Sequence, residues 1–342
     1  MILKGLLISL FVFSSLWISC NGLAKMEKSF SQKSYSLKNS NSPLEVIIFP
    51  ESGNLISQVY FDGKEMLHSP YITENNLPGK TLEGIPFLFP FANRLEKDFI
   101  PIGAKMHSIP PETKDLRRDK NGLLLHGFLY YQKGWELLTV QNATSKSYSD
   151  SRFIFDGKFL EAFPFPCTIK QELEMVGNSL TVTVTITNTG TEKLPLSFGF
   201  HPYFLAPPEW RKIGKISTNA KKVYEADKRL LPTGKLGFTE SILTDRNLSE
   251  LTLDHNFTDF PAREFPNSEL SLAGRKIRLE LLEGFDHILL FTPSDKNFVC
   301  MEPMFGPVNA FYLHKKGLYP NLRFLNPNKE VKASFRLSFY TN

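Results

Sequence analysis

The sequence predicts an all-β protein, and three features of the chain lead to that prediction. Apolar and polar residues alternate with a period of two in several segments, as in strands that have one buried face. Turn residues separate these segments, and the chain has 23 prolines and 21 glycines. No window shows a long apolar stripe with the 3.6-residue period of a helix. We therefore expect many antiparallel strands in one large β-sandwich, without an internal repeat.

The clearest strands lie before residue 190. Residues 55–61 are apolar at alternate positions and end at Asp62-Gly63, a strong hairpin turn signal. Residues 179–187 alternate between aliphatic residues and threonine. Residues 168–175 precede this run, and Val176-Gly177-Asn178 lies between them, so the two segments predict a hairpin.

The second half of the chain continues the pattern. Residues 277–281 and residues 331–339 place apolar side chains at every other position. The two longest polar stretches, residues 111–122 and 210–237, are expected to be surface loops, with their lysines and arginines in water.

The N-terminus has the composition of an export signal. Lys4 gives a basic start, and residues 6–18 are almost all apolar. This run is shorter than the roughly 20 residues that span a bilayer, and it is typical of a secretory signal. Its end, Leu16-Trp17-Ile18-Ser19-Cys20, resembles a bacterial lipobox, in which the cysteine is lipidated and becomes the new N-terminus. Ordinary cleavage after Ala24 is the alternative.

This leader divides the chain into three parts. We expect residues 1–19 to be a lipoprotein-type signal peptide, 20–42 a polar tether and 43–342 the folded domain. The protein is then exported and held on a bacterial membrane by the lipid on Cys20, facing the periplasm or the cell surface. The lipid anchor is the only membrane contact expected.

The composition narrows the possible partners. The chain is 42% hydrophobic and 22% charged, which is typical of a globular protein, and its net charge of +5 is modest. No block of lysine and arginine interleaved with aromatic residues is present, so nucleic acid is not an expected partner. Cys167 and Cys300 lie in apolar segments without a CxxC motif, so we expect buried free thiols and no metal site.

A carboxylate and an imidazole are candidates for acid–base chemistry. Glu302 follows an apolar strand and precedes a proline, where partial burial raises the pKa of a carboxyl and makes it a stronger base. His201 lies between Phe200 and Pro202, and histidine can donate a proton at neutral pH. The alternatives are a glutamate that faces water and a core histidine that is hydrogen-bonded to a carbonyl.

Three further polar residues stand in apolar surroundings. His126 ends an apolar run at Gly127, and Arg94 follows the apolar residues 85–92. Asp254 lies between Leu253 and His255. Arg94 offers a fork of donors to hydroxyl oxygens, and Asp254 can accept hydrogen bonds from hydroxyl groups. A snorkelling arginine, a turn-capping aspartate and a buried neutral histidine are the alternatives.

The order and local sequence of these blocks resemble the motifs of the aldose 1-epimerase (galactose mutarotase) family. The resemblance covers roughly residues 44–340 and rests on five blocks in order. They are Gly84-Ile85-Pro86 to Asn93-Arg94, Leu125-His126-Gly127, Gly199-Phe200-His201-Pro202-Tyr203-Phe204, Asp254-His255-Asn256-Phe257, and Thr292-Pro293 to Cys300-Met301-Glu302-Pro303.

The resemblance implies a fold and a reaction. The fold is a β-sandwich of the galactose-mutarotase type, with a hexose in a cleft on one sheet. The enzyme is an isomerase that interconverts α and β anomers by opening and closing the sugar ring. Its residue roles, carried onto this chain by motif, make Glu302 the base, His201 the acid and His126 an assistant at the ring oxygen. Arg94, Asp254 and Asn93 hold the hydroxyl groups, and no cofactor or metal takes part.

Other functions use parts of the same site. A hexose-6-phosphate 1-epimerase has the same proton chemistry, and Arg117, Arg118 or Lys120 could bind its phosphate, although export argues against it. A non-catalytic carbohydrate-binding lipoprotein would need the cleft but no acid–base pair. A glycosidase needs two carboxylates, and here the second one, Asp254, lies in the block that resembles a hydroxyl clamp.

Overall fold

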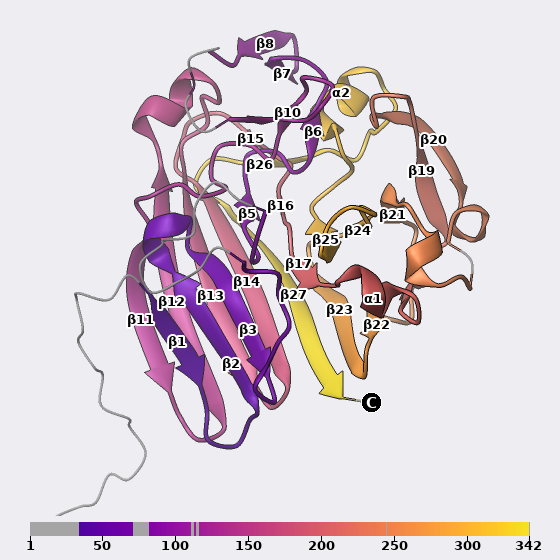
Figure 1. Cartoon of the computed structure of the whole chain (residues 1–342). Coiled ribbons are helices and arrows are strands. Elements are labelled where there is room, and N and C mark those ends of the chain that lie inside the picture. The colour runs from indigo at the N-terminus through magenta and orange to yellow at the C-terminus, as the bar shows by residue number, and fades with distance from the viewer. Residues whose placement is uncertain (1–33, 71–81, 111–112, 114–115, 244, 342) are drawn as a thin grey trace, which may run out of the picture.

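Two eight-stranded antiparallel sheets form the centre of the computed structural model, which describes residues 34–70, 82–110, 113, 116–243 and 245–341 (Figure 1). Sheet I has the strand order β11 (Glu136–Asn142), β12 (Lys146–Phe155), β13 (Cys167–Val176), β14 (Ser179–Asn188), β27 (Glu330–Thr341), β23 (Arg275–Glu283), β22 (Asn267–Leu272), β18 (Lys215–Thr218). Sheet II has the order β20 (Pro232–Phe238), β19 (Lys222–Ala226), β21 (Asp254–Thr258), β24 (His287–Phe291), β25 (Phe298–Met304), β16 (Gly199–Phe200), β5 (Phe87–Leu88), and β17 (Tyr203–Leu205) also pairs with β25.

Smaller sheets and short helices complete the described fold. The four-stranded sheet contains β1 (Tyr35–Lys38), β2 (Leu44–Phe49), β3 (Leu55–Phe61) and β4 (Lys64–Glu65). The other small sheets are β6–β10–β9 (Arg94–Leu95, Leu124–Leu125, Arg117–Arg118), β7–β8 (Phe99–Ile102, Lys105–Ser108) and β15–β26 (Leu194–Leu196, Arg323–Leu325). The α-helices are α1 (Pro208–Arg211) and α2 (Ala310–Lys315), and 3-10 turns cover Pro50–Ser52, Gly157–Glu161, Thr239–Ser241 and Leu248–Glu250.

Alternating side chains explain the long strands of sheet I. In β14 every second residue is buried, and the threonines between them are half-buried. β13 pairs with β14 from Cys167–Asn188 to Val176–Ser179, which is the predicted hairpin. β27 and β23 lie at the other two predicted segments and pair with each other. The antiparallel β-sandwich predicted from the sequence is confirmed.

Aromatic side chains join the layers. Phe200 on β16 contacts Phe335 on β27 with ring centroids 5.1 Å apart, so sheet II packs on sheet I through these rings. Phe61 on β3 lies 6.3 Å from Phe339 on β27, which places the four-stranded sheet on the same surface of sheet I. These four residues belong to one large apolar core.

The two faces of sheet II carry apolar clusters of unequal size. All seven residues of β25 are buried. Val299 and Met301 point into the large core, while Phe298, Cys300 and Met304 belong to a second, smaller cluster on the opposite face. Glu302 lies on this second face, among the apolar residues of the smaller cluster, and the candidate site is on this face.

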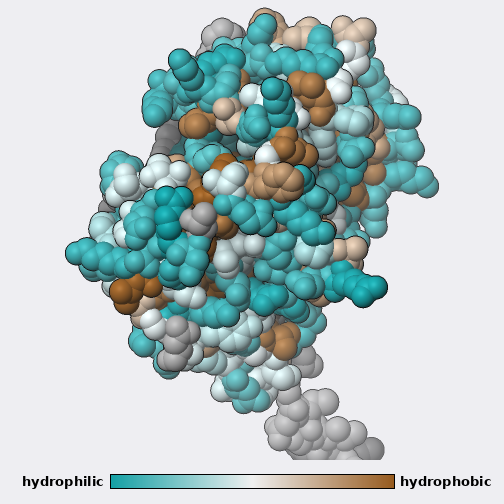
Figure 2. Space-filling view, turned by 90° about the vertical axis from the view of Figure 1, so that its right-hand side faces the viewer, coloured by the Kyte–Doolittle hydropathy of each residue, from teal (hydrophilic) through white to brown (hydrophobic). Residues whose placement is uncertain are grey.

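The outer edge of sheet II faces water. The side of the molecule near β19 and β20 is mainly hydrophilic, with apolar side chains in small groups (Figure 2). Leu236 and Phe238 on β20 are among the exposed apolar residues. Neither helix in the described ranges has the length and apolarity needed to cross a bilayer.

Two sequence-based expectations were wrong. Tyr35–Lys38 forms β1 and pairs with β2, although it lies in the segment 20–42 predicted as a tether. The hydroxyl of Tyr35 also donates to Ser149 Oγ at 3.1 Å, which ties β1 to sheet I. Residues 210–237, predicted as a loop, contain β18, β19 and most of β20. β18 and β20 lie at sheet edges and β19 is next to one, and at such positions the period-two signal is weak.

The structure tests the expectation for the two cysteines but not the one for the N-terminal leader. Cys167 and Cys300 are both buried free thiols, as expected. The export signal and Cys20 lie outside the described residues, so they stay predictions.

Candidate active site

Strand pairing brings Glu302 and Asp254 to one face of sheet II. Glu302 on β25 lies opposite Leu289 on β24, and Asp254 on β21 lies opposite Phe291, two residues further along β24. Residues opposite each other in an antiparallel pair point to the same face, as do residues two apart on one strand. Both carboxylates therefore lie on the face of the smaller apolar cluster.

His201 and His126 approach this face from the other side of β25. His201 directly follows β16, which pairs with β25. His126 directly follows β10, which pairs with β6, so that Arg94 and Leu125 lie side by side. A bridge between Phe89 and Gly127 connects this small sheet to the chain that follows β5.

The backbone around His126 is tightly constrained. Asn93 and His126 both have left-handed backbone, with φ of 58° and 66°, and the N–H of His126 donates to the Asn93 carbonyl at 3.0 Å. Gly127 also has a φ of 66°, and a Cβ there would lie 2.2 Å from the carbonyl oxygen of Phe89. Non-glycine residues with such backbone are uncommon and cluster at functional sites.

His201 and Glu302 form a buried pair. Nε2 of His201 lies 3.3 Å from Oε1 of Glu302, and the two residues are 4% and 0% exposed. The His201 ring stacks on Tyr203 with centroids 4.2 Å apart, and the His126 ring lies 5.0 Å away at a steep angle. Among the described residues, neither oxygen of Glu302 has a hydrogen-bond partner. The carboxyl group is therefore available to an incoming hydroxyl.

Burial determines the protonation of the pair. Desolvation raises the pKa of Glu302 well above 4.5, and the nearby charge of Asp254 raises it further. Desolvation lowers the pKa of His201 to about 3, and the charges of Arg117 and Arg94 act in the same direction. In the protein alone, the single proton of the pair therefore lies on Glu302. This differs from the carboxylate and imidazolium that the assigned roles require, because burial disfavours both charged forms.

His126 is neutral for the same reason. Burial lowers the pKa of its imidazole well below 6.5, and the charges of Arg117 and Arg94 act in the same direction. A neutral imidazole can offer one donor and one acceptor, but it is not a strong acid.

Arg94 and Asp254 form a two-point ion pair at the edge of the site. Nη1 and Nη2 of Arg94 donate to the two oxygens of Asp254 at 3.2 and 2.9 Å. Asn93 Oδ1 accepts from Nη1 at 3.1 Å, and Asp119 accepts from Nε at 2.9 Å. The side chain of Asp254 is 16% exposed, against 1% for Glu302, so the ion pair marks the side of the site nearest to water.

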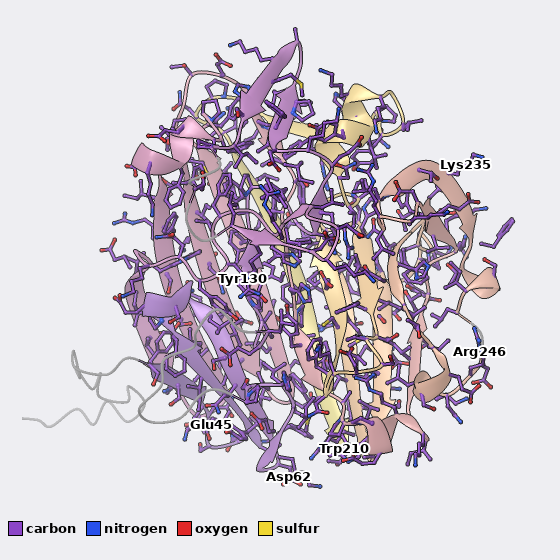
Figure 3. The ribbon with its side chains drawn as sticks, turned by 45° about the horizontal axis from the view of Figure 1, so that its top comes forward. Glu45, Asp62, Tyr130, Trp210, Lys235 and Arg246 are labelled. Atoms are coloured by element: carbon purple, nitrogen blue, oxygen red, sulfur yellow. The ribbon has the colours of Figure 1, made fainter. Side chains whose placement is uncertain are left out.

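The structure thus brings together all six residues that the sequence predicted for chemistry and sugar binding: Asn93, Arg94, His126, His201, Asp254, Glu302. It also adds residues that sequence reasoning missed. Tyr203 is in the HPYF block, so the motif itself contained the signal, whereas Asp119 and Tyr130 had none. The hydroxyls of Tyr130 and Tyr203 lie 2.6 Å apart, beneath the two imidazoles, and Tyr130 lies towards the middle of the molecule in Figure 3, where the other labelled residues are peripheral.

The three basic residues considered for phosphate point in different directions. The guanidinium carbon of Arg117 lies 4.0 Å from the centre of the Tyr130 ring, so this residue is beside the site. Arg118 makes two hydrogen bonds to Asp98 at the surface, and Lys120 is exposed.

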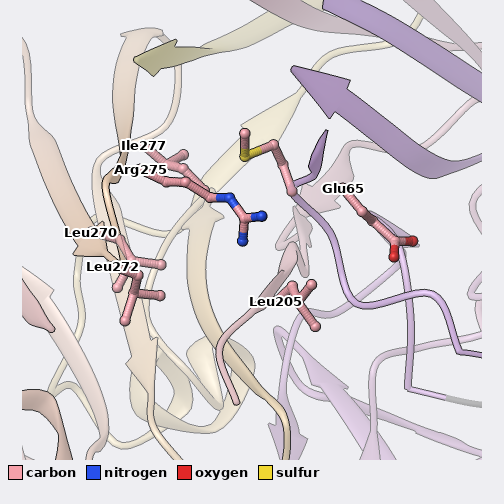
Figure 4. A pocket seen from close by; sticks show the side chains of 7 residues that line it. Glu65, Leu205, Leu270, Leu272, Arg275 and Ile277 are labelled. Atoms are coloured by element: carbon pink, nitrogen blue, oxygen red, sulfur yellow. The ribbon is translucent and has the colours of Figure 1, made fainter. Parts of the chain in front are cut away.

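Two cavities lie away from these residues. The smaller one, of about 10 Å³, lies between Glu65, Arg275 and four aliphatic side chains (Figure 4). The larger one, of about 240 Å³, lies beside Phe159 and Gln132. Neither is lined by any of the six site residues.

One set of side chains in the described ranges could hold a metal ion. Donor atoms of His201, Cys300 and Glu302 all lie within 4.8 Å of one another, and all three residues are buried. This set could not be predicted from the sequence, because the three residues do not have the spacing of a known metal motif.

Comparison with known proteins places this fold and site in a family. The family model for aldose 1-epimerase matches residues 48–338, so the chain belongs to the aldose 1-epimerase family. The resemblance seen in the sequence is confirmed.

Solved structures share the fold. The chain is similar to the Slr1438 protein of Synechocystis sp. PCC 6803, with 24% identity, a TM-score of 0.71 and coverage of 90% of this chain and 96% of that one. It is also similar to a galactose mutarotase-like protein of Clostridium acetobutylicum, with 20% identity, a TM-score of 0.77 and coverage of 94% and 99%. An aldose epimerase homologue of C. elegans has 14% identity, a TM-score of 0.67 and coverage of 90% and 98%. At these identities the likeness concerns the fold alone.

Proposed function

We propose that the protein is an aldose 1-epimerase that interconverts the α and β anomers of a free hexose. The observation that supports this best is the buried His201–Glu302 pair, 3.3 Å apart, beside the Arg94–Asp254 ion pair. The first pair supplies an acid and a base, and the second supplies donors and acceptors for sugar hydroxyls. The Tyr203 and Tyr130 rings lie against the two imidazoles and support them.

The reaction opens and closes the hemiacetal. Glu302, as a carboxylate, takes the proton of the C1 hydroxyl while His201, as an imidazolium, protonates the ring oxygen. The C1–O5 bond breaks to give the aldehyde, and the C1–C2 bond rotates by about half a turn. Closure then returns the proton from O5 to His201 and the proton from Glu302 to the C1 oxygen, which leaves the pair as it began.

The pair must first change its charge distribution. In the protein alone the shared proton lies on Glu302, so the reactive form is reached when that proton passes to Nε2 of His201. No proton is exchanged with solvent in this step, and the net charge of the site stays the same. We infer that hydrogen bonds from the sugar hydroxyls stabilise the ionised pair. His126 assists at the ring oxygen through its neutral imidazole.

A hexose-6-phosphate 1-epimerase is the second candidate. One observation favours it, namely the position of Arg117 over Tyr130, because its charge lies next to the two histidines. Arg118 and Lys120 do not add to it, since Arg118 pairs with Asp98 and Lys120 is at the surface.

Polarimetry with freshly dissolved sugars tests these alternatives. We expect the protein to accelerate the mutarotation of α-galactose or α-glucose more than that of α-glucose 6-phosphate. Glu302→Gln and His201→Ala should each lower the rate by about 100- to 10,000-fold. A preference for the phosphorylated sugar would favour the second candidate. Sugar binding without accelerated mutarotation would show a binding protein instead of an enzyme.

We also propose that the protein is exported and anchored by a lipid on Cys20. The support is the apolar leader and the lipobox-like end at Ser19-Cys20.

A further inference from the structure

The candidate active site contains a thiol that the proposed reaction does not use. Cys300 and Glu302 are two residues apart on β25, so their side chains lie on the same face of sheet II. His201 approaches that face, and one donor atom from each of the three residues lies within 4.8 Å of the other two. Cys300 is a free, fully buried thiol.

Three polar atoms of this set lack hydrogen-bond partners among the described residues. They are both side-chain oxygens of Glu302 and Nδ1 of His201, for which the part of the chain that the structure describes offers no hydrogen-bond partner. Both residues are more than nine-tenths buried. Nε2 of His201 lies 3.3 Å from Oε1 of Glu302 and 3.4 Å from the hydroxyl of Tyr203. Buried polar groups without partners are costly, and a bound ion is one way to satisfy them.

The donor types fit a borderline-soft divalent cation. Zinc is bound by thiolate, imidazole and carboxylate, usually in a tetrahedron, and three protein ligands leave a fourth position for another group. Bond lengths of about 2.0–2.3 Å place neighbouring ligand atoms roughly 3.5 Å apart, so small side-chain movements would bring these three donors into range. Magnesium and calcium prefer sets made of oxygen atoms, so they fit less well.

We propose that His201, Cys300 and Glu302 form a site for Zn²⁺ or a similar soft divalent cation, and that the ion blocks the active site when bound. On binding, the Cys300 thiol releases its proton to solvent and the thiolate becomes a ligand. Glu302 binds as a carboxylate, and His201 binds through a ring nitrogen lone pair. The proposed acid and base are then both occupied by the metal. The blocking effect rests on the proposed function, whereas metal binding does not.

Cobalt substitution tests the site without reference to activity. Co²⁺ bound to a thiolate gives a charge-transfer absorption in the near ultraviolet, and Zn²⁺ added afterwards should remove it. We expect the full-length protein to show this band with one ion bound per chain. Cys300→Ser should lose the band and bind Zn²⁺ at least about 100-fold more weakly.

The other two cysteines provide matched controls. Cys167→Ser makes the same chemical change at a buried thiol on sheet I, and Cys20→Ser removes the remaining cysteine of the chain. Both variants should keep the band. Cys300→Ala is a second variant of the same position, and thermal unfolding checks that each variant is folded. A band that persists in both Cys300 variants, or that is absent from the wild-type protein, would overturn the proposal.

Activity separates the two halves of the proposal. If the chain is an epimerase, micromolar Zn²⁺ should inhibit the wild type and the Cys167→Ser variant, while the Cys300→Ser variant stays active at the same concentration. Equal inhibition of the two cysteine variants would contradict the blocking role. A protein that shows the cobalt band but no epimerase activity would refute the proposed function and leave the metal site intact.

Discussion

At the residue scale, burial determines where the proton lies in the His201–Glu302 pair. His201 and Glu302 are both removed from water, so the neutral forms are favoured, and the pair holds one proton in the folded protein. In an unfolded chain the same two groups hold one proton between pH 4.5 and 6.5, their ordinary pKa values. Folding therefore changes where the proton lies within this window, but not how many protons are bound.

This distribution of protons predicts how the free energy of unfolding depends on pH. Below pH 4.5 the unfolded chain binds a second proton that the folded pair accepts only near pH 3, so the contribution of the pair to stability falls as the pH falls. Above pH 6.5 the unfolded chain loses its proton while Glu302 keeps one, so the contribution falls again as the pH rises. The difference in unfolding free energy between wild type and the double variant His201→Asn/Glu302→Gln should be flat inside the window. Outside it, the difference should change by about 1.4 kcal/mol per pH unit.

Urea unfolding at several pH values provides the measurement. The double variant replaces both titrating groups by neutral side chains of similar size, so all other titrations cancel in the difference. A difference that is constant over the whole pH range, or that is smallest inside the window, would contradict the assigned protonation.

Arg94 and Asp254 allow a prediction for substrate binding. Arg94→Lys removes the planar two-point fork but keeps the charge, so kcat/KM should fall roughly 10- to 150-fold, mainly through a higher KM. Asp119→Asn is the matched control, because it changes the partner of Nε and leaves the two contacts to Asp254. Steady-state polarimetry checks this prediction. An equal loss of kcat/KM in both variants would show that the two-point contact between Arg94 and Asp254 is not needed for substrate binding.

At the element scale, short strands and turns position the site. β16 and β10 have two residues each, and His201 and His126 directly follow them. Gly127 lies at the point where the chain after β10 approaches Phe89, and its bridge to that residue holds His126 in place.

A glycine pair tests this close approach. Gly127→Ala adds a Cβ that would lie 2.2 Å from the Phe89 oxygen, at a φ of 66°. Gly122→Ala has a similar φ of 77° but no atom within 4 Å of the new Cβ, so it isolates the backbone effect. We expect Gly122→Ala to lower the unfolding free energy by about 1 kcal/mol, and Gly127→Ala to lower it more and reduce activity. Equal costs in denaturant unfolding would show that the contact with Phe89 is unimportant.

The elements also show which parts of the fold could be predicted. β14 and β27 are long enough for their period-two pattern to be unambiguous. β5 and β16 are two residues long, which is too short for any period, and β19, next to the edge of sheet II, looked like a polar loop. Register and pairing of such pieces depend on tertiary contacts, so the sequence alone could not supply them.

The site was predictable to a similar degree. The motif blocks supplied Glu302, His201 and Asp254, but the second carboxylate on Arg94, from Asp119, lies in a turn with no distinguishing pattern. The protonation of the pair could not be read from residue type, because it depends on how completely the two groups are buried. That Cys300 lies close to His201 and Glu302 follows only from the register of β25.

At the scale of the whole molecule, one folded unit begins inside the segment predicted as a tether. β1 starts at Tyr35, so fewer residues separate Cys20 from the fold than the expected boundary at 42 implied. The match to the aldose 1-epimerase family covers residues 48–338, which is most of the described fold, and the proposed leader bears on location only.

The proposed lipid anchor predicts a change in partitioning. Produced with its leader in a bacterial host, the wild-type protein should enter the detergent phase and show the mass of a lipidated N-terminal Cys20. Cys20→Ser should move the protein to the aqueous phase, whereas the matched Cys167→Ser variant should behave as the wild type. A mature N-terminus at Lys25 would show ordinary cleavage after Ala24 and refute lipidation.

The central claim is that Glu302 takes the proton of the C1 hydroxyl of a bound hexose while His201 gives its proton to the ring oxygen. Exchange NMR at equilibrium measures this most directly, because it follows the conversion of α to β at C1 without consuming substrate. We predict fast exchange of galactose or glucose anomers with the wild type, and a loss of about 100-fold or more with Glu302→Gln although the sugar still binds. Near wild-type exchange in that variant would contradict the account.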